Sequence, residues 1–198
     1  EHRDNFSNRG IKIVRVEESG DIDFVVYGYM NNDIHEGKMG VSVFHYNSER
    51  NIIEEQLFLP CDSSFEYLRE DLKKLSYVNR SESLYLYMDQ TVYRVSLAEK
   101  KYDIVLTRID PECFLVSDDQ SQIAWMGEMD LYNSTSISVM DLETGSMRKI
   151  AAGQGNKIQA LGFVNTDFIY DTNFFTRELE TFSCLSFLSN GTQILPPQ

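Results

Sequence analysis

Short runs of apolar residues, separated by turn-forming residues, recur from residue 11 to residue 195, and this recurrence limits the fold more than any other feature of the sequence. Runs of this length, whether alternating or continuously apolar, predict β-strands. The segments between them are rich in Gly, Asn, Asp and Ser, which form turns. The runs lie at 11–16, 23–30, 40–46 and 52–59; at 75–78, 83–88, 91–97 and 102–109; at 113–117, 122–127, 136–142 and 146–151; and at 158–164, 167–170, 183–188 and 192–195. The sequence therefore predicts four sheets of four antiparallel strands.

The four sets repeat at a regular interval. The ends of their third strands align at Tyr46, Leu97, Leu142 and Leu188, which are 51, 45 and 46 residues apart. Repeats of about 40 to 50 residues are typical of β-propeller blades. The second strands carry apolar residues on both faces, as at Phe24 and Val25. Such a sheet needs a cover on each face, and stacked neighbouring sheets supply it.

The interval between the second strands of the first two sets is longer, because an additional segment lies between these sets. Within residues 64–75, Phe65, Leu68 and Leu72 follow one another at helical spacing after Ser64, a residue type that often caps helix N-termini. The segment predicts a short inserted helix, and a continuation of the sheet is the alternative.

The segment 121–150, SQIAWMGEMDLYNSTSISVMDLETGSMRKI, resembles a blade of WD40-like or TolB-like propellers, and 161–170, LGFVNTDFIY, resembles the inner hairpin of such a blade. The resemblance is one of architecture and is clearest over 121–170. It implies an all-β, β-propeller-like fold of about four blades with four antiparallel strands each. The expected parts are a linker at 1–10, blades at about 11–60, 74–110, 113–152 and 157–196, and a helix at about 64–75.

Four blades are at the lower limit for a closed propeller ring. Three arrangements are open: a compact four-bladed ring, an open arc of a longer propeller, and an arc that a partner chain completes. Because the chain begins with Glu1 and not Met, we expect a segment of a larger extracytoplasmic protein, in the cell envelope or secreted. An open arc would leave sheet faces exposed at 11–16 and at the last blade, which favours self-association through open blade edges.

The composition excludes some partners. The formal net charge of −13 argues against nucleic-acid binding, since binding to phosphates depends on Lys and Arg. No apolar run reaches the roughly 18 residues of a membrane-spanning helix, so direct membrane insertion of this segment is not expected. The cysteines, Cys61, Cys113 and Cys184, form no C-x-x-C pair, and we interpret them as small buried side chains.

Catalytic motifs are missing from the sequence. It contains no G-x-S-x-G nucleophile elbow, no H-E-x-x-H motif, no glycine-rich phosphate loop and no calcium-binding loop. Asp118, Asp119 and Asp130 lie at turns, where a carboxylate usually accepts hydrogen bonds from its own backbone. His45 lies on a strand and is expected to have a cross-strand partner. The sequence therefore assigns no catalytic residue, no metal ligand and no cofactor.

Four residues are the candidates for a ligand-binding or partner-binding surface: Phe174, Phe175, Tyr132 and His35. Phe174 and Phe175 lie in the longer loop at 171–180, and loops of this kind often contact ligands. His35 lies in a polar loop. Such a surface suits a protein or carbohydrate ligand, and packing between blades is the alternative for the aromatic residues.

The predicted function is that of a non-catalytic binding or scaffolding module with no assigned ligand. The blade repeat and the missing motifs favour it over enzymatic activity. One alternative is a gating propeller attached to a hydrolase domain. The other is a propeller glycosidase or lyase that uses two carboxylates drawn from the 31 acidic residues.

Overall fold

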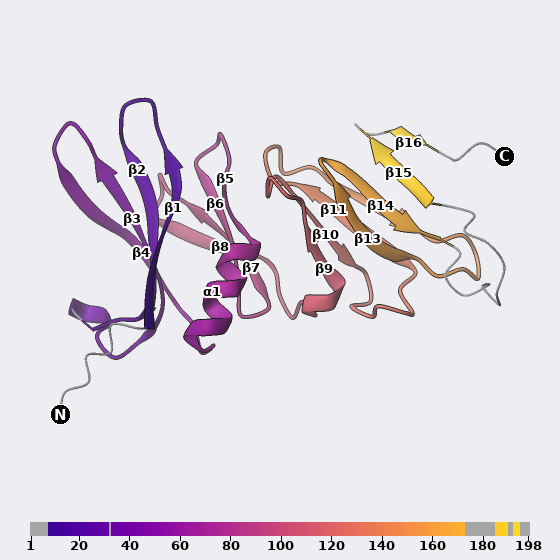
Figure 1. Cartoon of the computed structure of the whole chain (residues 1–198), viewed down its shortest axis with the longest axis horizontal. Coiled ribbons are helices and arrows are strands. Elements are labelled where there is room, and N and C mark those ends of the chain that lie inside the picture. Colours follow the sequence, from indigo (N-terminus) through magenta and orange to yellow (C-terminus); the bar gives the residue numbers. More distant parts are fainter. Residues whose placement is uncertain (1–7, 32, 173–184, 190–191, 195–198) are drawn as a thin grey trace. The chain divides into compact units, whose positions relative to one another are not determined.

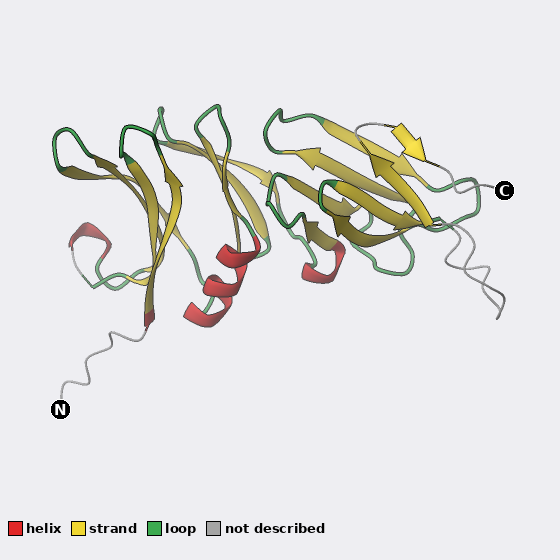
Figure 2. Ribbon diagram, turned by 45° about the horizontal axis from the view of Figure 1, so that its top comes forward, coloured by secondary structure: helices red, strands yellow, loops and turns green. Residues whose placement is uncertain are grey.

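The described residues form four four-stranded antiparallel sheets, each with its strands in chain order. The computed structural model describes residues 8–31, 33–172, 185–189 and 192–194 (Figures 1 and 2). Sheet 1 comprises β1 (Arg9–Val16), β2 (Ile22–Tyr29), β3 (Met39–Asn47) and β4 (Ile52–Pro60), and sheet 2 comprises β5 (Ser76–Val78), β6 (Ser83–Met88), β7 (Thr91–Ser96) and β8 (Lys101–Leu106). Sheet 3 comprises β9 (Phe114–Val116), β10 (Gln122–Met126), β11 (Ser136–Asp141) and β12 (Met147–Ala151), and sheet 4 comprises β13 (Gln159–Val164), β14 (Asp167–Asp171), β15 (Leu185–Ser189) and β16 (Thr192–Ile194). The prediction of an all-β, β-propeller-like fold built from four-stranded meanders is confirmed.

The chain separates into two compact units. Residues 1–107 hold sheets 1 and 2, and residues 108–198 hold sheets 3 and 4. The expectation of one continuous domain over 11–198, and the choice between a ring and an arc, stay predictions. The first strand begins at Arg9, within the segment expected as a linker, because Arg9 and Gly10 pair with Gly28 and Tyr27 of β2.

The inserted helix is present as α1 (Phe65–Lys74), and its apolar residues recur as the sequence predicted. Ser64 occupies the N-cap position, but its side chain makes no capping hydrogen bond. Its carbonyl oxygen accepts the first helical hydrogen bond, from the N–H of Leu68 at 2.9 Å. Short 3-10 turns, η2 (Asp33–His35) and η3 (Pro111–Cys113), lie in the loops.

The core of the first unit lies between sheets 1 and 2 and is extended by α1. Val25, Val41 and Val43 of sheet 1 pack with Leu84 and Leu86 of sheet 2 in one buried cluster. The apolar side of the helix joins this cluster through Leu68 and Leu72, and the ring of Phe65 stacks on that of Tyr27 at 5.8 Å. The helix therefore contributes to the same core as the two sheets.

Sheets 3 and 4 pack in the same way in the second unit. The shared cluster comprises Cys113, Ala124, Met126, Ile137, Val139, Ile158, Phe168 and Tyr170. Stacking of neighbouring sheets through apolar faces, the physical basis of the sequence prediction, thus occurs within each unit.

The other face of sheet 1 is apolar as well. Ile11 and Ile13, two residues apart and therefore on the same face of β1, are 70% and 59% exposed. Phe24 and Phe44 lie beside them on β2 and β3, with their rings stacked at 5.3 Å. This exposed face fits the predicted self-association, which stays a prediction.

Gly28 allows β1 and β2 to pair closely. Its φ is +118°, and a Cβ at this position would lie 2.2 Å from the carbonyl oxygen of Asn8. Gly28→Ala is therefore expected to lower the free energy of unfolding by about 2 kcal/mol, through backbone strain and this clash. Urea denaturation would measure the change. Gly37→Ala, at φ +81° with its nearest neighbour 3.6 Å away, is the control and should lose only about 1 kcal/mol. Equal losses for the two variants would contradict the assignment of the clash.

None of the described helices has both the length and the apolar character needed to cross a bilayer.

Candidate functional site

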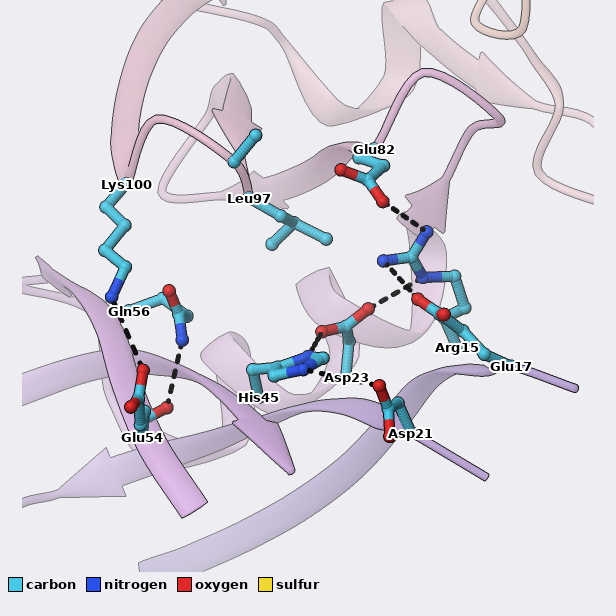
Figure 3. A pocket seen from close by; sticks show the side chains of 11 residues that line it. Arg15, Glu17, Asp21, Asp23, His45, Glu54, Gln56, Glu82, Leu97 and Lys100 are labelled. Atoms are coloured by element: carbon cyan, nitrogen blue, oxygen red, sulfur yellow. Dashed lines mark hydrogen bonds and ion pairs between the residues drawn. The ribbon is translucent and has the colours of Figure 1, made fainter. Parts of the chain in front are cut away.

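A cavity of about 370 Å³ lies in the first unit, where the hairpin turns of sheets 1 and 2 meet (Figure 3). We refer to it as the hairpin pocket. Its lining comes from β1 to β4, the β1–β2 turn, the β5–β6 turn and the β7–β8 turn. The lining residues are Arg15, Glu17, Asp21, Asp23, His45, Glu54, Gln56, Glu82, Leu97, Ala98 and Lys100.

A row of ionisable side chains crosses sheet 1 at the floor of the pocket. Arg15 of β1 pairs with Asp23 of β2, Asp23 pairs with His45 of β3, and His45 pairs with Glu54 of β4. Each strand thus contributes one residue, and basic and acidic side chains alternate across the sheet. The opposite charges of Arg15 and Asp23 attract each other across two neighbouring strands, which stabilises the sheet.

Two β-bulges place this row. The pairing of β1 with β2 shifts between Ile13 and Arg15, so that Val14 is the extra residue, and Arg15 comes to lie opposite Asp23. The pairing of β3 with β4 shifts between Val43 and Phe44, which leaves Gln56 as the extra residue. Gln56 then lines the pocket. Bulges at sheet edges redirect side chains in this way.

Asp23 is the most deeply buried charged residue of the row, with 2% of its surface exposed. The Nε of Arg15 donates to its Oδ2 at 2.7 Å, and the Nδ1 of His45 lies 2.8 Å from its Oδ1. Because an ionised carboxylate only accepts hydrogen bonds, Nδ1 is the donor. In the neutral imidazole, Nε2 is then an acceptor on the pocket side, and the Oδ2 of Asp21 lies 3.9 Å from it.

Two ion pairs connect the sheets across the pocket. The guanidinium of Arg15 lies 2.9 Å from Glu17 and 3.8 Å from Glu82, which is in the β5–β6 turn of sheet 2. The ammonium of Lys100, in the β7–β8 turn, lies 3.6 Å from Glu54 of sheet 1. Figure 3 shows both pairs reaching from one sheet to the other.

Negative charge predominates in the pocket. Five carboxylates line it, against the two permanent cations Arg15 and Lys100. Hydrogen bonds from the N–H and hydroxyl of Ser48, both 2.7 Å long, hold the pKa of the Asp21 carboxyl below its usual range. Asp21 therefore keeps its charge at mildly acidic pH. The field in the pocket favours a cation over an anion.

The lining offers acceptors but no hydroxyl or thiol nucleophile, since it contains no Ser, Thr or Cys. Burial raises the pKa of the Cys113 thiol to about 11 and also raises the pKa of Cys61, so both described cysteines are neutral thiols. Both are buried, as predicted, and neither forms a disulfide within the described residues. Within the described ranges, no group of three or more His, Cys, Asp or Glu side chains is arranged to hold a metal ion.

His35, one of the four predicted surface residues, lies outside the hairpin pocket. Its imidazole stacks on the ring of Phe58 at 4.0 Å, and its Nε2 lies 3.5 Å from the Oε1 of Glu55. Its Nδ1 is buried without a hydrogen-bond partner among the residues that the structure describes. A smaller cavity of about 130 Å³ lies beside it, also lined by Arg9 and Phe44.

The other predicted surface residues lie elsewhere in the chain. Tyr132 is exposed in the loop between β10 and β11, in the second unit, where its N–H donates to Asp130. Phe174 and Phe175 lie outside the described residues. The structure thus brings neither His35 nor Tyr132 into the hairpin pocket, and the role of all four residues as a ligand surface stays a prediction.

Two other interpretations from the sequence are confirmed, that of Asp119 and Asp130 as turn carboxylates and that of His45 as a cross-strand residue. Asp119 accepts from the N–H of Ser121 and Asp130 from the N–H groups of Tyr132 and Asn133, which are local turn contacts. His45 has its expected cross-strand partner. The sequence did not indicate that this partner is buried or that Arg15 shares it. A basic residue on β1 and an acidic residue on β2 were the only available signal.

Comparison with family models finds no match, and comparison with curated proteins finds none. Among solved structures, the chain is similar to the β-propeller domain of the Trilobed protease from Pyrococcus furiosus, with 8% identity, a TM-score of 0.41, and coverage of 96% of this chain and 57% of that one. It is also similar to Porphyromonas gingivalis dipeptidyl peptidase 4, with 11% identity, a TM-score of 0.41, and coverage of 87% and 30%. It is similar as well to Pyrococcus horikoshii acylaminoacyl peptidase, with 9% identity, a TM-score of 0.40, and coverage of 96% of this chain and 32% of that one. The chain spans between 30% and 57% of the length of these structures.

Proposed function

We propose that this chain is a non-catalytic binding module, of the WD40-like or TolB-like kind, within a larger extracytoplasmic protein, and that its hairpin pocket binds a cationic group. The cation is a small molecule or a side chain of a protein partner. The observation that carries the proposal is the pocket itself, a cavity of about 370 Å³ lined by five carboxylates and two permanent cations. The repeated four-stranded sheets support the module, and the lack of a Ser, Thr or Cys nucleophile in the lining supports a binding role.

Binding of a simple cation tests the proposal. Isothermal titration calorimetry at low ionic strength is expected to detect propylammonium and not propionate, which is matched in size. Asp21→Asn should weaken cation binding by about fivefold, because one charge among several is removed. Added salt should weaken it further through screening. Glu66→Gln, an exposed substitution in the first turn of α1, is the control and should leave the affinity unchanged. Equal binding of propionate, or no binding of either probe, would refute the proposal.

The proposal that the chain is non-catalytic is tested separately. The chain is expected to show no turnover with a panel of peptide, ester and glycoside substrates. Turnover that is lost in Asp21→Asn or Glu54→Gln, with the fold intact by circular dichroism, would show that the pocket is an enzyme site.

A further inference from the structure

We propose that the cation in the hairpin pocket is a primary ammonium or guanidinium group whose N–H bonds are accepted jointly by His45 Nε2 and Asp21 Oδ2. This inference rests on the proposed function and names the chemical class of the ligand. It follows from three features: the orientation of the histidine ring, the spacing of two acceptors, and the residue types that line the pocket.

The first feature is the orientation of His45. The buried Asp23 carboxylate, which also accepts from Arg15, receives the Nδ1–H of the ring. In the neutral ring this leaves Nε2 with a lone pair on the side of the pocket. Nε2 makes no hydrogen bond of 3.5 Å or less within the part of the chain that the structure describes. An N–H group of a ligand could donate a hydrogen bond to this lone pair, whereas a ligand acceptor could not.

The second feature is the distance of 3.9 Å between His45 Nε2 and Asp21 Oδ2. An N–H donor lies about 2.9 Å from its acceptor. Because the two acceptors are less than twice this distance apart, one ligand nitrogen can lie within hydrogen-bond distance of both of them. The two Ser48 hydrogen bonds go to Oδ1 of Asp21, which leaves Oδ2 available on the pocket side. Asp21 Oδ2 and His45 Nε2 together therefore suit a ligand nitrogen that carries at least two hydrogens, one for each acceptor.

The third feature is that none of the eleven lining residues is Phe, Tyr or Trp. Quaternary ammonium groups have no N–H bond, and proteins bind them mainly against aromatic faces. The hairpin pocket offers charged and amide acceptors instead. It should therefore distinguish an ammonium from its permethylated form.

The test compares probes that have the same charge. Calorimetry is expected to show propylammonium and propylguanidinium binding at least about tenfold more tightly than tetramethylammonium, since only the first two donate hydrogen bonds. A capped peptide with one lysine shows whether the bound ammonium belongs to a protein side chain or to a small molecule. Its binding would identify a protein partner, and binding of the free amine alone would identify a small molecule.

Variants separate the inference from the proposed function. His45→Gln should reduce propylammonium affinity about tenfold and leave tetramethylammonium unchanged, because only the first probe loses an acceptor placed by Asp23. Lys100→Gln should tighten both by removing a competing positive charge. If both cations bind equally well and His45→Gln has no effect, the inference fails while the cation-binding function stands. If no cation binds, the function fails as well.

Discussion

Replacing Arg15 with methionine is expected to lower the free energy of unfolding by about 3 kcal/mol, at the low end of the range for breaking a buried ion pair. Arg15 donates to Asp23 at 2.7 Å, and Asp23 is almost completely buried. Without the guanidinium, His45 is the one side-chain partner left to the carboxylate within the described ranges, and the carboxylate cannot regain the water it lost on folding. Urea denaturation followed by circular dichroism would measure the loss.

Arg94→Met is the matched control for this prediction. Arg94 also forms a 2.8 Å ion pair within a sheet, with Asp103, but both side chains are about half exposed or more. Exposed pairs contribute about 0 to 1 kcal/mol, so the control should change stability little. Adding Asp23→Asn to Arg15→Met should regain part of the loss, because the unpaired charge is removed. A loss below about 1 kcal/mol for Arg15→Met would show that the pair is not a major contribution to stability.

Leu68→Ala on α1 is expected to lower the free energy of unfolding by a similar amount, about 3 kcal/mol, through lost burial and the cavity that remains. Leu68 is fully buried and joins the cluster formed by sheets 1 and 2. The adjacent Tyr67, which is 73% exposed, provides the control: Tyr67→Ala should change stability by no more than about 0.5 kcal/mol. Comparable losses at the two positions would mean that intrinsic helix stability, and not packing on the sheets, dominates.

The strands and the helix could be predicted because their determinants are local. Alternation in 11–16, turn residues between the runs and the helical spacing of Leu68 and Leu72 depend on neighbouring residues only. The interval of about 45 residues then indicated repeated sheets. The structure has these elements within one or two residues of their predicted ends for most strands.

The hairpin pocket could not be predicted in the same way, because it depends on pairing between strands. Strict alternation in β1 would place Arg15 on the face of Ile11 and Ile13. The bulge at Val14 places it opposite Asp23 instead. The bulge at Gln56 has a similar effect on β4. Bulges that occur without glycine leave little trace in one sequence. The sequence therefore pointed to surface residues such as Tyr132, chosen by residue type and loop position, and not to the residues of the hairpin pocket.

The bulge at Val14 has a consequence for folding fidelity. If β1 and β2 paired without it beyond Ile13, Arg15 would move to the apolar face and Asp23 would be buried opposite Val14. The second change is unfavourable, since the buried carboxylate would lose its counterion. The ion pair therefore discriminates against this slipped alignment more strongly than the aliphatic residues do, because they would tolerate it. The Arg15–Asp23 ion pair therefore helps to fix the register of the first hairpin.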